Sequence, residues 1–82
     1  MAYVYILKCR DDTYYTGYAV DVEKRLVEHL NGKASKYTRG RLPVQLVYRE
    51  ELPGKSEAMK RELQIKKLTK TQKQKLINEQ SG

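Results

Sequence analysis

The sequence predicts a single α+β domain in which a small three-stranded antiparallel sheet is flanked by helices. Alternating, β-prone runs occur near the N-terminus and again after the middle of the chain, whereas helix-capping residues precede three other segments. The resulting order of elements is ββαβαα. Because 82 residues suffice for one domain and not for two, we expect it to span residues 1–82.

The first 19 residues read as a β-hairpin. Residues 2–9 are apolar in both registers, with Tyr3 and Tyr5 on one face and Val4 and Ile6 on the other. A strand that is apolar on both faces is typical of a central position in its sheet. The turn-forming residues 10–13 separate it from a second β-prone run at 14–19.

A helix and a basic connector follow the hairpin. Asp21 is suited to cap a helix that runs to about Leu30 and is closed by Asn31-Gly32. Its apolar stripe consists of Val22, Leu26 and Leu30. The connector, residues 33–41, has room for one short helical turn.

The third strand is predicted at residues 44–52, where Val44, Leu46 and Tyr48 alternate after Pro43; Pro53-Gly54 ends it. Ser56 is the expected cap of a helix to about Leu68. Thr69 and Gln72 resemble a capping box that opens a last helix to about Glu79.

Composition points to an intracellular, nucleic-acid-binding protein. Seventeen Lys and Arg against ten Asp and Glu give a net charge of +7, which suits a polyanionic partner, although a solvated basic surface is the alternative. The single cysteine, Cys9, excludes an intrachain disulfide and fits a reducing cytoplasm. The apolar run at residues 3–7 is too short for a signal sequence or a membrane span.

Glu62 stands out on a helical wheel of residues 56–68. It falls in the middle of an apolar arc, and an ionised carboxylate facing a core is unfavourable unless it is paired or binds a metal. The arc is formed by Ala58, Met59, Leu63, Ile65 and Leu68. Either an ion pair with Lys66, four residues on, or one with an arginine elsewhere is the structural alternative to a functional carboxylate.

The preceding helix holds Arg25 and His29, four residues apart and therefore on one face beside the apolar stripe. A lone histidine in such a place is more often structural than catalytic. The connector surrounds Tyr37 with cations, an arrangement suited to phosphate contact with base or sugar stacking. These cations are Lys33, Lys36, Arg39 and Arg41. The alternative is a solvated loop whose tyrosine packs onto the core.

Together these segments resemble the GIY-YIG nuclease superfamily. Tyr3-Val-Tyr5 followed by Tyr15-Thr-Gly17 resembles its paired signature. The first of the two motifs reads Gly-Ile-Tyr in the family and Tyr-Val-Tyr here. Arg25 and His29 match its helix motif, and Ala58-Met-Lys-Arg-Glu62 is similar to its metal-binding segment. Residues 36–44 resemble the small single-domain bacterial branch, close to the UPF0213 (YhbQ-like) proteins.

The resemblance implies a metal-dependent endonuclease that hydrolyses phosphodiester bonds in DNA, with single-stranded, branched or damaged DNA as candidate substrates and DNA repair as a context. Glu62 would hold one Mg²⁺ or Mn²⁺. Tyr5, together with Tyr15, would position or deprotonate the attacking water, and Arg25 would bind the phosphate and assist the tyrosine. His29 would share the proton transfer or orient Tyr15. Gly17, which lacks a Cβ, would let the phosphate approach the strand.

A shared site makes a demand on the hairpin. Tyr5 and Tyr15 lie on one face only when the loop has an odd length, so that residue 7 pairs with 15 and residue 5 with 17. Tyr14 and Tyr18 then lie on the other face, as core or helix-packing rings.

Two other functions stay open. Larger family nucleases carry an Asn after the metal-binding Glu, and the nearest one here, Asn78, is predicted on a different helix. A non-catalytic nucleic-acid-binding module on the same fold is therefore one alternative. The other is a small basic interaction protein that dimerises through its hairpin edge; we expect a monomer or a weak homodimer.

Overall fold

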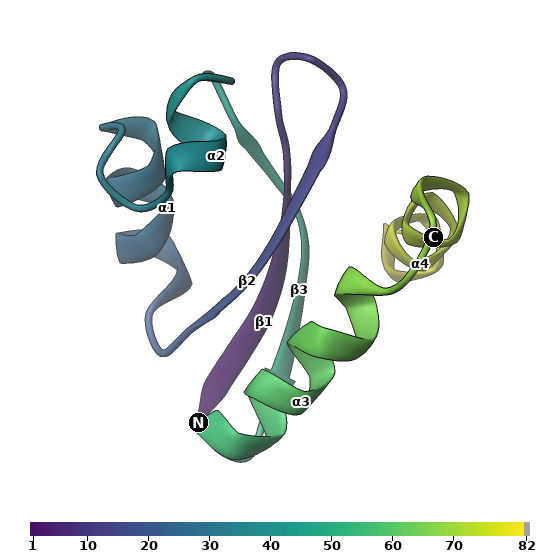
Figure 1. Ribbon diagram of the computed structural model, residues 1–82. Coiled ribbons are helices and arrows are strands. Elements are labelled where there is room, and N and C mark those ends of the chain that lie inside the picture. The colour runs from purple at the N-terminus through teal and green to yellow at the C-terminus, as the bar shows by residue number, and fades with distance from the viewer. Residues whose placement is uncertain (82) are drawn as a thin grey trace.

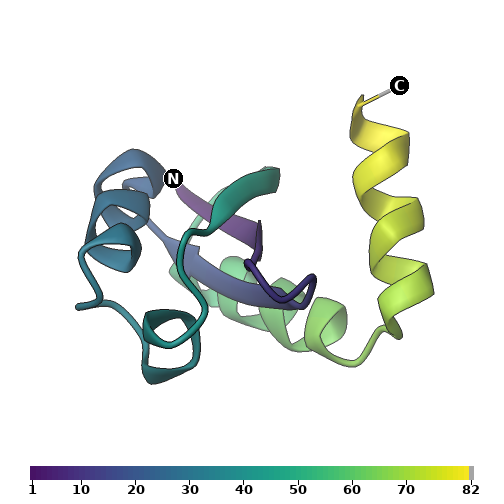
Figure 2. The ribbon, with the colours of Figure 1, turned by 90° about the horizontal axis from the view of Figure 1, so that it is seen from above.

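A computed structural model describes residues 1–81 and has the predicted sheet. Three antiparallel strands lie in the order β2-β1-β3, with β1 (Ala2–Lys8) between β2 (Tyr14–Ala19) and β3 (Gln45–Leu52). Helices α1 (Val22–Leu30) and α2 (Lys36–Arg39) cover one face, and α3 (Lys55–Lys66) covers the other (Figure 1). The chain ends in α4 (Lys70–Ser81), which stands on the far side of the sheet from α1 and α2 (Figure 2).

The central strand β1 contributes side chains to two separate hydrophobic cores, one on each face of the sheet, which explains why it is apolar on both faces. Val4 and Ile6 pack with Ile65 of α3 on one side. Tyr5 and Leu7 lie in the other core, where α1 covers the sheet. All of these side chains are almost completely buried.

The hairpin has the predicted register. Tyr5 pairs with Gly17 and Leu7 with Tyr15, across a five-residue loop, residues 9–13. Tyr5 and Tyr15 consequently share the face that carries α1 and α2. Tyr14 and Tyr18 pack against the opposite core, as expected.

Local capping explains where most helices begin and end. The carboxylate of Asp21 accepts a hydrogen bond from the backbone N–H of Lys24, and Gly32 takes the positive φ of 74° that a residue after a helix often needs. Thr69 and Gln72 exchange the two hydrogen bonds of a capping box at the start of α4. The predicted cap at Ser56 is wrong, because α3 already begins at Lys55 with Gly54 as its N-cap.

The expected single stripe of Val44, Leu46 and Tyr48 is also wrong. A bulge at β3 lets Leu7 pair with Leu46 while the adjacent Ile6 pairs with Tyr48. One extra residue reverses the direction of later side chains. Val44 and Leu46 therefore lie in the α1 core, whereas Tyr48 lies in the α3 core.

Three apolar residues expected in a core are exposed instead. Leu30 on α1 is 44% exposed, and Met59 and Leu63 on α3 are 48% and 57% exposed. On α1, the buried position next to Leu30 is taken by His29. On α3, contact with the sheet is confined to a narrow stripe through Ala58 and Ile65.

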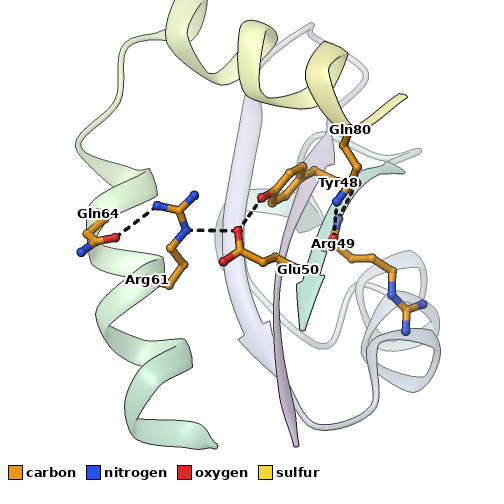
Figure 3. Close-up of polar contacts among 6 residues, drawn as sticks. All are labelled: Tyr48, Arg49, Glu50, Arg61, Gln64 and Gln80. Carbon is orange, nitrogen blue, oxygen red and sulfur yellow. Dashed lines mark hydrogen bonds and ion pairs between the residues drawn. The ribbon is translucent and has the colours of Figure 1, made fainter. Parts of the chain in front are cut away.

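Polar contacts attach α3 and α4 to β3 (Figure 3). Glu50 accepts hydrogen bonds from the hydroxyl of Tyr48 and from Arg61, which also donates to Gln64. On α4, the side-chain amide of Gln80 both accepts from the backbone N–H of Arg49 and donates to its carbonyl. Gln80 thus occupies hydrogen-bonding groups of an edge strand. No helix within residues 1–81 is long and apolar enough to cross a membrane.

Candidate functional site

A chain of buried polar side chains crosses the core between β1 and the two helices above it. The hydroxyl of Tyr5 lies 2.9 Å from Nε2 of His29, and Nδ1 of the same ring lies 2.8 Å from Oγ1 of Thr38. Tyr5 is 1% exposed, and His29 and Thr38 are fully buried. The Thr38 hydroxyl also lies 3.4 Å from the carbonyl oxygen of Ser35.

Each member of this chain is held by a different element. Tyr5 comes from the central strand, His29 from the last turn of α1 and Thr38 from α2. The short helix α2 follows Ser35, whose side chain caps it by accepting from the backbone N–H of Tyr37. The Gly32 turn returns the chain so that α2 lies beside α1.

The hydrogen-bond partners assign the histidine tautomer. A carbonyl oxygen only accepts, so Thr38 directs its one proton to Ser35 and accepts from Nδ1–H of His29. Nε2 is then the bare nitrogen, and it accepts the hydroxyl proton of Tyr5. His29 therefore presents a basic nitrogen to a phenol.

Burial keeps both partners neutral. Burial, and after it the positive charge of Arg25, lowers the pKa of His29. Burial is also the main reason that the pKa of Tyr5 is raised, with smaller contributions from Tyr15 and Glu62, while Arg25 acts in the opposite direction. Neither an imidazolium nor a free phenolate is favoured at neutral pH.

Tyr15 and Gly17 complete the β2 side of this cluster. The ring of Tyr15 is half-buried and lies edge-on to His29, with the two centroids 5.1 Å apart, and 6.5 Å from the ring of Tyr5. Gly17 is buried directly opposite Tyr5. A methyl group at Gly17 would meet the Tyr5 hydroxyl at 2.7 Å, so glycine makes room for the tyrosine ring as well as for any ligand.

Arg25 and Glu62 both act on the pKa of Tyr5. Arg25 of α1 is half-buried, pairs with Glu28 at 3.0 Å and acts on the pKa of both Tyr5 and His29. Glu62 of α3 is 16% exposed and pairs with Lys66 at 3.7 Å. The ion pair predicted as the structural alternative for Glu62 is thus present, but it is long and half open to solvent.

The expected position of Glu62 in the middle of an apolar arc is wrong. Because Met59 and Leu63 are exposed, the buried stripe of α3 is narrower, and Glu62 lies at its edge. The charge of Glu62 makes the smallest of the contributions to the shifted pKa of Tyr5. The carboxylate is therefore sheltered without being buried in apolar surroundings.

The side chains fit only a sparse metal site. In the part of the chain that the structure describes, no three His, Cys, Asp or Glu side chains gather into a ligand cluster. Glu62, with its single long ion pair, could still contribute one carboxylate. Mg²⁺ often takes one or two carboxylates and completes its shell with waters and substrate phosphate oxygens, so one carboxylate is compatible with such an ion.

The four cations of the basic connector, residues 33–41, lie in two different environments. Lys33, Lys36 and Arg39 are exposed on the surface beside α2. Arg41 instead pairs with Asp11 at 2.9 Å and stacks on Tyr37, with its guanidinium carbon 3.9 Å from the ring centroid. The Tyr37 ring also lies 6.1 Å from that of Tyr15, so it packs toward the site and is 37% exposed.

Thr38 is the residue of this cluster that sequence reasoning missed. Its place depends on the turn at Gly32 and on the fold of α2, neither of which a periodic pattern reveals. The only available signal was Ser35, a capping residue that predicts a helix start three residues earlier.

Comparisons with known proteins identify the family of the chain. The GIY-YIG catalytic domain family matches residues 1–76. A UPF0213 protein of Staphylococcus saprophyticus is 56% identical over 77 residues, covering 94% of each chain, and one of Natronomonas pharaonis is 50% identical over 80 residues, covering 98% of this chain and 94% of the relative.

Solved structures give the same result. The solution NMR structure of a UPF0213 protein from Bacillus halodurans has a TM-score of 0.64 and 46% identity, covering all of this chain and 88% of the other. A second solution NMR structure, of an E. faecalis protein, has a TM-score of 0.62 and 41% identity, covering 93% of this chain and 81% of the other. The chain therefore belongs to the GIY-YIG family, whose domain implies a nuclease-type function, and to its UPF0213 branch.

Proposed function

We propose that the chain is a metal-dependent endonuclease that hydrolyses phosphodiester bonds in DNA. The observation that supports this most is the buried chain Tyr5–His29–Thr38, together with the charges of Arg25 and Glu62 that act on the pKa of Tyr5. A purely structural core of this size gains little from two neutral proton-transfer groups in series, next to a cation and an anion. The net charge of +7 supports a nucleic-acid substrate.

In this proposal the attacking water loses its proton through Tyr5 to His29. As the water oxygen forms its bond to phosphorus, the Tyr5 oxygen takes the water proton while the phenol proton passes to Nε2 of His29. The bond from phosphorus to the leaving oxygen then breaks, the leaving oxygen takes a proton from solvent water, and His29 returns its proton to solvent. Because both transfers are coupled, Tyr5 never exists as a free phenolate, which its raised pKa would forbid.

Thr38 holds His29 in the tautomer that this step needs. The Tyr5 hydroxyl is shielded from bulk water, so the substrate reaches it where the half-buried Arg25 and Tyr15 side chains move aside. Arg25 would release Glu28 and bind a phosphate oxygen through its planar guanidinium. Tyr15 would line the approach of the water.

Glu62 is the residue that would hold Mg²⁺ or Mn²⁺, together with waters and the phosphate. Such an ion supplies Lewis-acid stabilisation of the charge that develops on the phosphate and the leaving oxygen. Binding would replace the long contact of Glu62 with Lys66. Lys33, Lys36 and Arg39 would add phosphate contacts along the strand, and the buried, unpaired thiol of Cys9 fits a cytoplasmic setting.

A non-catalytic nucleic-acid-binding module is the second candidate, and the 1% exposure of Tyr5 favours it, because the proposed catalytic hydroxyl is closed in this state. One experiment separates the two. Pure protein is incubated with single-stranded, duplex and branched DNA in Mg²⁺, Mn²⁺ or EDTA. The endonuclease proposal requires cleavage that EDTA abolishes, whereas salt-sensitive binding without cleavage under every condition supports the module.

A further inference from the structure

A cavity adjoins the candidate site along the open edge of the sheet. It has a volume of about 220 Å³ and lies between β2, α2 and the junction of α3 with α4. Because β2 is an edge strand, this side of the sheet is not covered by another strand. The lining residues are Tyr14, Tyr15, Thr16, Tyr37, Lys66 and Lys73.

The cavity is continuous with the site. Tyr15 lines it and also contacts His29. Lys66 lines it and pairs with Glu62, which lies one helical turn away on α3. One turn of helix spans about 5.4 Å, so a chain bound at Glu62 reaches the cavity with its neighbouring unit.

The charges in the cavity are positive and incompletely neutralised. Lys73 is half-buried, and no ion pair joins it to a carboxylate among residues 1–81. Lys66 has only the long contact to Glu62, which a bound cation would take over. An ammonium group without a carboxylate partner is a natural contact for a phosphate.

The cavity also contains an unsatisfied polar group. Thr16 is 3% exposed, lines the cavity, and its hydroxyl lacks a hydrogen-bond partner within the described residues. A buried hydroxyl left unpaired is unfavourable by about 1–3 kcal/mol. A ligand oxygen or ring nitrogen bound in the cavity would give this hydroxyl a partner.

We propose that this pocket binds the nucleotide next to the scissile phosphate, with Lys66 and Lys73 on its phosphate and its unpaired base against the rings of Tyr15 and Tyr37. The proposal rests on the endonuclease function for its position relative to the cut. Base–aromatic stacking is tolerant of sequence. A cavity of about 220 Å³ is smaller than the roughly 300–1,000 Å³ of sites for drug-sized ligands, so its size suits a single base.

The test measures binding in EDTA, so that it needs neither metal nor chemistry. A labelled single-stranded oligonucleotide and a duplex of the same sequence are titrated with wild-type protein, Lys73→Gln and the matched control Lys75→Gln. Lys75 lies on the same helix, is exposed and does not line the cavity. We expect Lys73→Gln to weaken single-strand binding several-fold and to reduce the salt slope by about 0.7, the value for one phosphate contact to a single strand.

On the duplex, the two variants should behave alike. Equal effects of Lys73→Gln and Lys75→Gln on single-strand binding would contradict the proposed pocket. If the wild type nevertheless cleaves DNA in the metal-dependent assay, the endonuclease proposal is unaffected. The reverse result, a specific Lys73 effect without any cleavage, would remove the endonuclease and keep the pocket as part of a binding module.

Thr16→Val supplies an independent readout. Because the hydroxyl has no partner in the free protein, its removal should leave the Tm unchanged or raise it, while single-strand binding weakens. A clear fall in Tm would show that the hydroxyl already has a hydrogen-bond partner inside the protein. That result would contradict the proposed contact of Thr16 with the nucleotide.

Discussion

Tyr5 and Gly17 face each other across β1 and β2 so closely that a single added carbon would touch the tyrosine hydroxyl, at 2.7 Å. The tyrosine cannot withdraw, since its ring is buried and its hydroxyl is bonded to His29. The relationship connects the family signature to the chemistry. The glycine of the second signature creates the space that the last tyrosine of the first one occupies.

Gly17→Ala should therefore destabilise the protein by about 1–3 kcal/mol, the usual range for overpacking a core. Gly40→Ala is the matched control, because a Cβ at Gly40 meets nothing within 4 Å and its φ is −86°. The control should be neutral or more stable by about 0.4–1 kcal/mol. Urea unfolding of both variants checks the prediction, and equal stabilities would show that Tyr5 does not need this space.

Thr38→Val should leave Nδ1–H of His29 buried without an acceptor, at a loss of about 1–3 kcal/mol of stability. In the endonuclease, kcat should fall while KM stays near its wild-type value, since Thr38 positions His29 and does not reach the substrate. Thr38→Ser keeps the hydroxyl and should recover most of the rate. A Ser variant as slow as the Val variant would argue against a positioning role.

Stability should fall on mild acidification. In the folded state burial lowers the pKa of His29, so the unfolded chain, with a histidine pKa near 6.5, binds the proton more readily. Unfolding is therefore favoured increasingly as the pH drops below about 6.5, well above the range in which carboxylates protonate. His29 is the only histidine, so His29→Gln should flatten the dependence of Tm on pH in this range.

The lowered pKa of His29 also predicts how the rate of cleavage depends on pH. Nε2 of His29 must be unprotonated to accept the phenol proton, so the rate should rise with pH through the lowered pKa of His29 and then level off. A pH–rate profile of the wild type measures this directly. A rate that falls as the pH rises from acid to neutral would contradict the proton path.

Gln80 should control how firmly the end of α4 is attached to β3. Its side chain satisfies both backbone groups of Arg49 (Figure 3), so Gln80→Ala should speed hydrogen exchange at the Arg49 amide. Gln74→Ala, an exposed glutamine of the same helix, is the control and should leave that amide unchanged. Equal exchange in both variants would mean that the amide is protected by other means.

The sequence was most informative where local rules decide the outcome. That Tyr5 and Tyr15 share a face follows from counting the residues of the hairpin loop. The caps at Asp21 and Thr69 act within one helical turn. It was less informative where a distant contact decides. A single bulge separates Leu46 from Tyr48, and no alternating pattern signals it.

The site divides in the same way. Tyr5 and Tyr15 share a face because strands alternate, and Arg25 and His29 share one because helices repeat. The burial of His29 in place of Leu30, and its contact with Thr38, depend on how α2 folds back on α1, which lies outside any local pattern.

The most direct test of the central claim compares two glutamates of α3 as Gln variants, Glu62→Gln and Glu57→Gln, in the metal-dependent cleavage assay. Glu57 is exposed and makes no ion pair within residues 1–81, so its variant should cut DNA like the wild type. Glu62→Gln should retain the fold and DNA binding but lose cleavage in both Mg²⁺ and Mn²⁺. Undiminished cleavage by a folded Glu62→Gln protein would contradict the account.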